Sequence, residues 1–222
     1  MHGRDNNVVA LQMFNRSSLV RFYSSFPRIR SRAPEWSGTA VVNSTFSSLS
    51  SSDFKGQWLV LFFYPLDFTF VCPTEIIAFS DRISEFKKLN TAVVGVSIDS
   101  KFSHLNWSKM PRSQGGIGQL EYPLLSDITK SISKDYGVLI ENGPDAGIAL
   151  RGTFIMDPNG ILKHYQANDL GVGRSVDEVL RLVEGFQFVE QHGEVCPVDW
   201  KKGKATIQPL KSAEYFKKTY KD

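Results

Sequence analysis

Hydrophobic runs and amphipathic stretches alternate along the chain from about residue 36 onward. Two apolar runs, at residues 58–64 and 92–98, are short and continuous, which is typical of strands buried on both faces of a sheet. Between them, apolar side chains recur at helical spacing and predict an amphipathic helix over residues 73–89. The first half of the body is therefore predicted to be a strand–helix–strand unit.

The second half of the body is predicted to be a hairpin followed by a helix. Residues 153–157 and 161–165 have strand character and flank the turn sequence Pro-Asn-Gly. Ser175 and Glu178 have the spacing of a capping box, which indicates that a helix begins there. Together with the first half, this pattern predicts one α/β domain with a mixed central sheet flanked by helices, the layout of a thioredoxin-like fold.

Two further segments complete the prediction. Residues 44–52 are rich in serine and are compatible with either a loop or a hairpin. Residues 212–220 predict a short helix with an aromatic face, which would form a helical extension at the C-terminus.

The formal net charge of +3 is unevenly distributed. Residues 1–34 contain six arginines, no lysine and one acidic residue, which gives +5, while the rest of the chain carries −2. The body is therefore close to neutral and has no basic stripe suited to nucleic acid. Residues 1–34 are also rich in serine, and their apolar run at residues 8–11 is too short for a secretory signal. We interpret this segment as a mitochondrial transit peptide, cleaved after Tyr23; the alternative is a flexible basic tail.

Composition excludes several classes of protein. No apolar run approaches the roughly 20 residues of a membrane-spanning helix, so an integral membrane protein is not expected. The two cysteines, 124 positions apart and without a C-x-x-C motif, exclude a disulfide scaffold, a thioredoxin-type redox pair and a zinc ribbon. His104, His164 and His192 do not form a metal-ligand pattern, and a Cys–His hydrolase stays open only formally, without a second motif.

Cys72 is the strongest candidate for chemistry. It lies where the first buried strand ends and the helix begins, and Pro73 is suited to the first helical position. Free backbone N–H groups and the positive end of the helix dipole would therefore face the sulfur and favour the thiolate. A more acidic thiol is intrinsically less nucleophilic, so a fast enzyme would also have to activate its electrophile. The alternative interpretation is an inert buried cysteine.

Two motifs resemble a known family. Residues 63–75, FYPLDFTFVCPTE, resemble the active-site signature of the typical two-cysteine peroxiredoxins, and residues 193–197, GEVCP, resemble the segment around their second cysteine. The resemblance extends from about Phe46 to Tyr220, and the arginine-rich leader points to the mitochondrial branch.

The resemblance implies roles near the first cysteine. Cys72 would be the peroxidatic cysteine, which attacks a peroxide oxygen and becomes a sulfenic acid. Thr69 would hold the peroxide through its hydroxyl group, and Pro65 would shield the sulfenic acid from water.

It also implies an electrostatic network. Arg151 would stabilise the thiolate and polarise the peroxide, which is the electrophile activation required above. Glu75 and Arg174 would orient Arg151. Without the resemblance, Arg151 and Arg174 would be interpreted as surface arginines, and Pro65 as the end of a strand.

Cys196 would be the resolving cysteine, which forms a disulfide with Cys72. Sequence separation does not show whether that bond lies within one chain; the resemblance implies a bond between two chains of a homodimer, with dimers assembling into a decamer or a larger ring. Thioredoxin would reduce the disulfide, and no metal, flavin or haem would be needed. The substrates would be hydrogen peroxide and organic hydroperoxides. Val198 and Asp199 depart from the small residues expected after Cys196.

These inferences divide the chain into three parts: a transit peptide at residues 1–34, a peroxidase domain at residues 35–195 and a resolving-cysteine tail at residues 196–222. The expected location is the mitochondrial matrix. A holdase chaperone and a redox-signalling relay are the alternative main roles. Residues 115–118 and the pair Tyr215-Phe216 resemble segments of easily over-oxidised peroxiredoxins, so the C-terminal helix is expected to pack over an active site.

Overall fold

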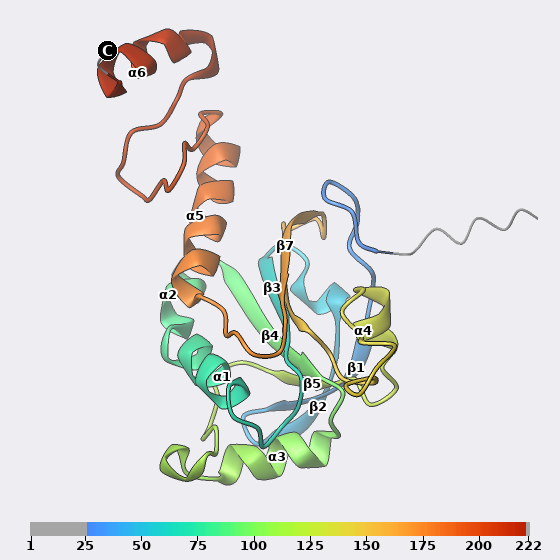
Figure 1. Cartoon of the computed structure of the whole chain (residues 1–222). Coiled ribbons are helices and arrows are strands. Elements are labelled where there is room, and N and C mark those ends of the chain that lie inside the picture. Colours follow the sequence, from blue (N-terminus) through green and yellow to red (C-terminus); the bar gives the residue numbers. More distant parts are fainter. Residues whose placement is uncertain (1–25, 221–222) are drawn as a thin grey trace, which may run out of the picture.

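Seven strands form one mixed sheet in the structure, a computed structural model that describes residues 26–220 (Figure 1). The order across the sheet is β2-β1-β5-β4-β3-β6-β7. β3 is parallel to β4 and antiparallel to β6. The strands are β1 (Ser37–Val42), β2 (Thr45–Ser50), β3 (Trp58–Phe63), β4 (Thr91–Ser97), β5 (Leu124–Ser126), β6 (Arg151–Met156) and β7 (Leu162–Asn168).

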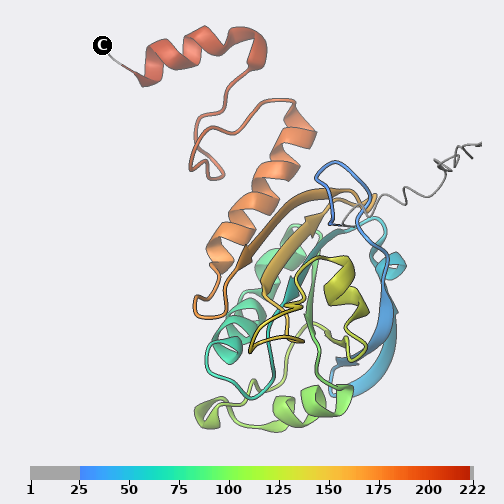
Figure 2. The same ribbon diagram turned by 45° about the vertical axis from the view of Figure 1, so that its right-hand side comes forward.

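Helices cover both faces of this sheet, which confirms the predicted architecture (Figures 1 and 2). Four of them contribute side chains to the buried cluster on one face, and the short α4 contributes to the cluster on the other. The first four are α1 (Cys72–Asp81), α2 (Ile83–Lys88), α3 (Lys101–Lys109) and α5 (Val176–His192), α4 is Ser131–Asp135, and α6 (Ser212–Thr219) lies near the C-terminus. Short 3-10 helices are η2 (Ser51–Phe54), η3 (Arg112–Gln114) and η4 (Pro209–Lys211).

The central strand β3 belongs to both clusters. All of its side chains are buried, and they alternate between the two faces, as the period of a strand requires. Trp58, Val60 and Phe62 pack toward α1 and α5, whereas Leu59, Leu61 and Phe63 pack toward α4. The loop after β3 therefore starts from a firmly held point and leads directly to the first residue of α1.

The helix predicted over residues 73–89 is interrupted. Arg82 leaves helical geometry, with φ −104° and ψ 7°, and separates α1 from α2. Its side chain pairs with Glu85 and donates to Asp177 at 2.7 Å. The apolar spacing continues across the break because Phe79, Ile83 and Phe86 all belong to one buried cluster. Periodicity alone therefore does not reveal the interruption.

The predicted hairpin at residues 153–165 is confirmed as β6 and β7, which pair in antiparallel fashion. The serine-rich segment at residues 44–52 is also part of a hairpin, since β2 pairs with β1 along its whole length.

Residues before β1 are already part of the folded body. The backbone of Arg30 donates to Leu162 at 2.8 Å, and Leu162 donates to Ser31 at 2.9 Å. Phe26 contacts Tyr165 edge to face at 4.9 Å between ring centroids. These residues lie within the segment interpreted as a leader but after the predicted cut at Tyr23, which is outside the described residues.

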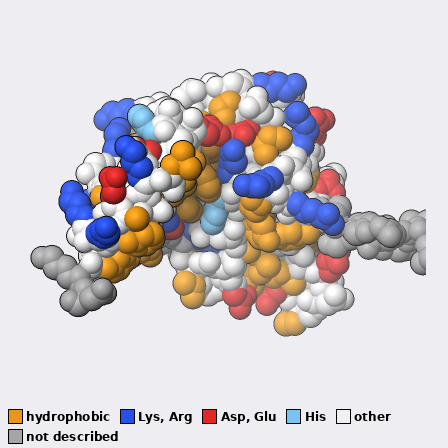
Figure 3. Space-filling view, turned by 90° about the horizontal axis from the view of Figure 1, so that it is seen from above, with side chains coloured by type: hydrophobic (Ala, Val, Ile, Leu, Met, Phe, Trp, Pro, Cys, Tyr) orange, Lys and Arg blue, Asp and Glu red, His pale blue; other side chains and the backbone are white. Residues whose placement is uncertain are grey.

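The C-terminal arm, residues 193–220, projects from the body. α5 carries the chain beyond the sheet, and α6 lies at the outer end of the arm (Figures 1 and 2). Figure 3 looks down onto this end and shows hydrophobic side chains grouped on the arm between lysines. Of the helices within residues 26–220, none combines the length and apolar character needed to cross a bilayer.

Candidate active site

Cys72 is the first residue of α1 and Pro73 the second. The helix begins one residue earlier than the proline predicts, because Val71 already has helical backbone angles of φ −83° and ψ −36°. Cys72 is only 1% exposed and packs in the same cluster as Ile76 and Phe79. The positive end of the α1 dipole is thus directed at a sulfur that the core holds in place.

Sheet topology brings Arg151 to this sulfur. β6 runs antiparallel to β3, with Thr153 opposite Phe62, so the first residue of β6 lies beside the end of β3. From there, Nη1 of Arg151 lies 3.5 Å from Sγ of Cys72. The same Nη1 donates to Oε2 of Glu75 at 2.7 Å, and Nε donates to the Leu170 carbonyl at 2.8 Å. Three contacts therefore fix the guanidinium against the thiol.

Glu75 lies one turn into α1 and joins two arginines. Besides Arg151, it accepts three hydrogen bonds from Arg174. The backbone N and Nε of Arg174 each donate to Oε1 at 2.8 Å, and Nη2 donates to Oε2 at 3.0 Å. The side chains of all three residues are at most 4% exposed. In such a buried, fully hydrogen-bonded network, each charge orients its neighbours.

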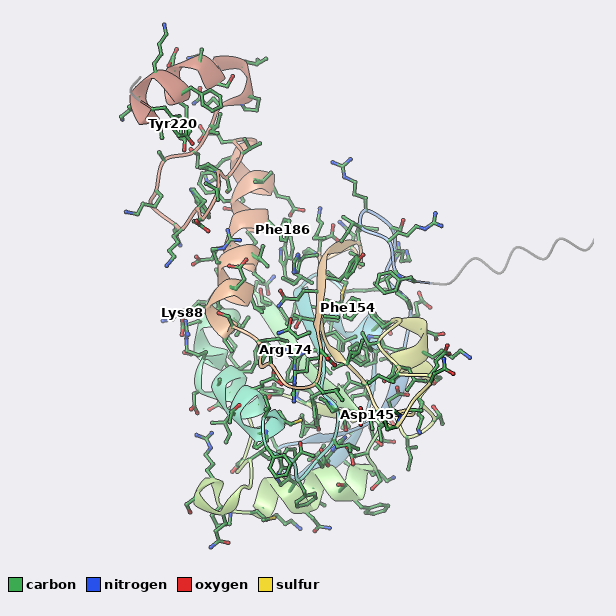
Figure 4. The ribbon with its side chains drawn as sticks, viewed as in Figure 1. Lys88, Asp145, Phe154, Arg174, Phe186 and Tyr220 are labelled. Carbon is green, nitrogen blue, oxygen red and sulfur yellow. The ribbon has the colours of Figure 1, made fainter. Side chains whose placement is uncertain are left out.

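Arg174 is anchored to the sheet as well as to α1. Nη1 donates to the carbonyls of Phe63 at 2.8 Å and Gly152 at 2.6 Å, and its guanidinium carbon lies 5.2 Å from the ring centroid of Phe62. In Figure 4 the labelled Arg174 lies in the middle of the body, whereas Phe186 and Tyr220 lie toward the arm. Arg174 thus ties the start of α1 to the end of β3 and the start of β6.

The carboxyl group of Glu75 is kept charged by this network. Burial by itself raises the pKa of Glu75, but the hydrogen bonds and charge of Arg174, together with the charge of Arg151, outweigh it and lower the pKa below its ordinary value. The site therefore presents a fixed anion whose function is to hold two cations.

Pro65 and Thr69 lie on the loop between β3 and α1. Pro65 is buried and Thr69 is half-buried, and the Thr69 hydroxyl donates to the Leu66 carbonyl at 2.9 Å. Between them, Phe68 has a φ of 55°, a left-handed conformation unusual for a bulky side chain. Phe70, on the same loop, is 93% exposed.

A buried group of polar side chains that no sequence motif indicated includes Tyr64, Asp67 and His104. The Tyr64 hydroxyl donates to Oδ1 of Asp67 at 2.8 Å, and Nδ1 of His104 lies 2.8 Å from Oδ2 of the same carboxylate. The Asp67 backbone N donates to Asp99 at 2.9 Å. Burial, followed by the charge of Asp67, raises the pKa of Asp99. The three-residue spacing of His104 and Trp107 could have indicated a buried histidine, because it places both side chains on the same, buried face of α3.

Cys196 lies apart from Cys72. Both cysteines are free, and the Cys196 thiol contacts the Gly185 carbonyl of α5 at 3.8 Å. Cys72 begins α1, which lies in the body, whereas Cys196 lies on the arm that projects from it (Figures 1 and 2). Burial raises the pKa of Cys196, and the charge of Arg181 opposes that rise. A single chain in this conformation does not bring the two sulfurs together.

The C-terminal helix α6, which was expected to pack over an active site, does not do so within one chain. None of the α6 side chains is buried, and the rings of Tyr215 and Phe216 pack against each other with their centroids 5.7 Å apart. α6 lies at the far end of the arm from α1. Within residues 26–220, no cluster of three or more histidine, cysteine or acidic side chains has the arrangement of a metal site.

Comparison with known proteins gives consistent matches. The model of the AhpC/TSA family matches residues 29–165, and that of the C-terminal domain of 1-Cys peroxiredoxin matches residues 185–222, which include Cys196. The chain is 61% identical over 201 residues to the mitochondrial thioredoxin-dependent peroxide reductase of Mus musculus, covering 89% of this chain and 77% of the relative.

The chain is 60% identical over 195 residues to the Drosophila melanogaster protein of the same name, covering 86% of this chain and 82% of the relative. The crystal structure of reduced Plasmodium vivax 2-Cys peroxiredoxin superposes with a TM-score of 0.81 at 44% identity, covering 85% of this chain and 98% of that one.

Proposed function

The chain belongs to the AhpC/TSA family, as a two-cysteine peroxiredoxin, and from that premise we propose that it is a thiol peroxidase acting through Cys72. The observation that carries the proposal is the guanidinium of Arg151, which contacts both Cys72 Sγ at 3.5 Å and Glu75 at 2.7 Å. A fixed cation beside a buried thiol stabilises the thiolate and is already in place for the charge that develops on a peroxide.

The first step oxidises Cys72. Its thiolate attacks one oxygen of hydrogen peroxide or an organic hydroperoxide, an S–O bond forms and the O–O bond breaks. The sulfur is oxidised to a sulfenic acid, and the departing hydroxide or alkoxide takes up a proton to leave as water or an alcohol. Arg151 stabilises the departing charge, Thr69 holds the peroxide and Pro65 limits the access of water; Glu75 and Arg174 position Arg151.

The second step joins two chains. Cys196 of a second copy attacks the Cys72 sulfenic acid, a disulfide forms and water leaves. The separation of the two cysteines within one chain supports a bond between chains, because Cys196 is on an arm that projects from the body. A head-to-tail homodimer meets this requirement, and dimers would assemble into a decamer or a larger ring, in which α6 would cover the active site of a neighbouring copy.

Thioredoxin is the proposed reductant of the disulfide, in agreement with the names of the relatives from Mus musculus and Drosophila melanogaster. The proposed location is the mitochondrion. The arginine-rich segment at residues 1–34 and the mitochondrial names of these relatives both support it. Residues 35–195 would form the peroxidase domain and residues 196–222 the tail that carries the resolving cysteine.

The decisive test compares the full chain with its Cys72→Ser and Cys196→Ser variants in a thioredoxin-coupled peroxide assay. Serine has no comparable oxidation chemistry, so Cys72→Ser should abolish turnover. Turnover above background in Cys72→Ser would refute the assignment. Protection of an unfolded client by the same variant would measure a holdase activity separately, since shielding needs no Cys72 thiol.

A further inference from the structure

An arginine near Cys196 has no part in the steps above. Arg181 is on α5, four residues before Gly185, whose carbonyl contacts the Cys196 thiol at 3.8 Å. Residues four apart lie on the same face of a helix. Arg181 and the point where Cys196 rests on α5 therefore share one face.

A carboxylate holds Arg181 in a defined orientation. Its Nε and Nη2 donate to the two carboxylate oxygens of Glu178 at 2.6 and 2.7 Å. This bidentate pairing fixes the plane of the guanidinium. The remaining Nη1 is directed at the loop after Cys196 and lies 3.5 Å from the Trp200 carbonyl.

The side chain of Trp200 packs that loop against α5. The residue is 2% exposed, and its ring lies 4.9 Å from that of Phe188 between centroids. Its backbone N donates to the Pro197 carbonyl at 3.2 Å, which closes a turn immediately after Cys196. Asp199, within this turn, has a φ of 53°. Arg181 therefore contacts the backbone of the residue that both ends the turn and packs its ring on α5.

Charge couples the same two residues. Burial raises the pKa of Cys196, and Arg181 is the charged group that lowers it. The pKa of Arg181 is raised mainly by the hydrogen bond and charge of Glu178, and to a smaller extent by the charges of Asp199 and Cys196. The charge that acts on Cys196 thus belongs to a guanidinium that Glu178 and the Trp200 carbonyl hold in place.

We propose that Arg181 is a positioning residue for the resolving step, fixing the Cys196–Trp200 turn and stabilising the Cys196 thiolate as it attacks. The inference rests on the proposed function. In that step an S–S bond forms while the S–O bond of the Cys72 sulfenic acid breaks. The Cys196 sulfur is oxidised, the Cys72 sulfur is reduced, and the hydroxide that leaves combines with the proton released by Cys196 to give water.

The first test isolates Cys196 in a Cys72→Ser chain and follows its alkylation by iodoacetamide across a pH series. Arg181→Gln should lower the rate near neutral pH by about threefold, the size expected for loss of one partly screened charge, and move the pH profile upward. Arg181→Lys should retain most of the rate because the charge remains. The matched control is Arg82→Gln, which removes an arginine paired with Glu85 and Asp177 on the neighbouring surface and should change nothing.

The second test uses chains with both cysteines. Arg181→Gln should slow disulfide formation after one equivalent of peroxide by about threefold, while the rate of Cys72 oxidation stays unchanged. Added salt should slow the unsubstituted chain toward the rate of the variant.

An alkylation profile of Arg181→Gln that superimposes on that of the parent would overturn the proposal. So would equal slowing by Arg181→Lys and Arg181→Gln, because it would show that the charge at position 181 does not act on the Cys196 thiolate. Failure of the proposed function has a different signature, in which the unsubstituted chain consumes no peroxide. The alkylation profile would then still report on Arg181.

Discussion

The two cysteines occupy opposite kinds of environment. Cys72 is 1% exposed, begins a helix that packs on the sheet and has its charge partners fixed by β3 and β6. Cys196 is half-buried on an arm whose contacts are mainly with α5, and its pKa is raised by burial. One chain therefore supplies all the charged partners of the first sulfur, whereas the second sulfur still requires a reaction partner from another copy.

This difference separates what the fold must hold rigid from what it must allow to move. Peroxide attack depends on the placement of a cation within an ångström or so of its working position, which a core-anchored network provides. The proposed disulfide joins Cys72 to Cys196 of a second copy, so it depends on how two chains meet, because both cysteines are free within one chain. Changes near Cys72 should therefore alter chemistry and stability together, whereas changes on the arm should alter later steps only.

The largest effect that separates the two regions is expected from Cys196→Ser. The variant should consume one equivalent of peroxide at the normal rate and then stop, because the sulfenic acid at Cys72 has no partner thiol. Non-reducing electrophoresis should show dimers in the oxidised parent and monomers in the variant. An oxidised parent that runs as a monomer with an internal disulfide would contradict the bond between chains.

Substitution of Arg151 should have the next largest effect. Arg151→Gln removes the cation at Cys72 and should reduce the second-order rate with hydrogen peroxide by about 100-fold, comparable to the loss of one group that stabilises transition-state charge. Arg151→Lys keeps the charge without the planar fork that contacts sulfur and carboxylate together, so it should be only partly active. Stopped-flow tryptophan fluorescence would measure both. Rates equal to that of the parent would remove Arg151 from the mechanism.

Glu75→Gln should act on stability as well as on rate. Loss of its charge leaves two buried arginines without their anion, which should cost about 3 kcal/mol of the free energy of unfolding. Because the folded-state pKa of Glu75 is lowered, its stabilising contribution is present above the unfolded pKa and is lost as the pH falls through the folded one. The parent should thus lose stability below about pH 5 more steeply than the variant does.

Urea titrations at several pH values would measure this difference. Glu85→Gln is the matched control, because its carboxylate is 44% exposed and also pairs with an arginine. A loss of stability as large in Glu85→Gln as in Glu75→Gln would show that the effect does not come from the buried network.

Sequence reasoning succeeds where a local pattern determines the outcome. The strands, the N-cap of α5 at Ser175 and the place of Cys72 in the first turn of α1 follow from the spacing of nearby residues, and the structure confirms them. The reciprocal half of the predicted capping box is not seen, because the Glu178 carboxylate accepts from Arg181. The contacts of Arg151 and Arg174 depend instead on the antiparallel placement of β6 beside β3, which no local pattern encodes. Only the family resemblance indicated these two arginines, and their catalytic roles stay predictions.

The same limit explains the features that sequence analysis missed. The break at Arg82 lies within an uninterrupted apolar period, and the contact between Asp67 and His104 joins residues 37 positions apart. The predicted packing of the C-terminal helix over an active site is not found within one chain, where α6 has no buried side chain. Pairing between distant elements, and between copies, is set by tertiary packing rather than by propensity.

The smallest effect on the body is expected from deletion of residues 212–222. α6 has no buried side chain, so the free energy of unfolding of the body should change by less than about 0.5 kcal/mol, as for surface changes generally. Cys72 oxidation should keep its rate, because its partners lie outside the deleted segment. If α6 covers the active site of a second copy, its loss should speed disulfide formation and raise the peroxide dose needed to produce sulfinic acid. Mass spectrometry of Cys72 across a peroxide titration would measure that dose, and an unchanged sulfinic fraction in the truncated chain would mean that α6 does not control access.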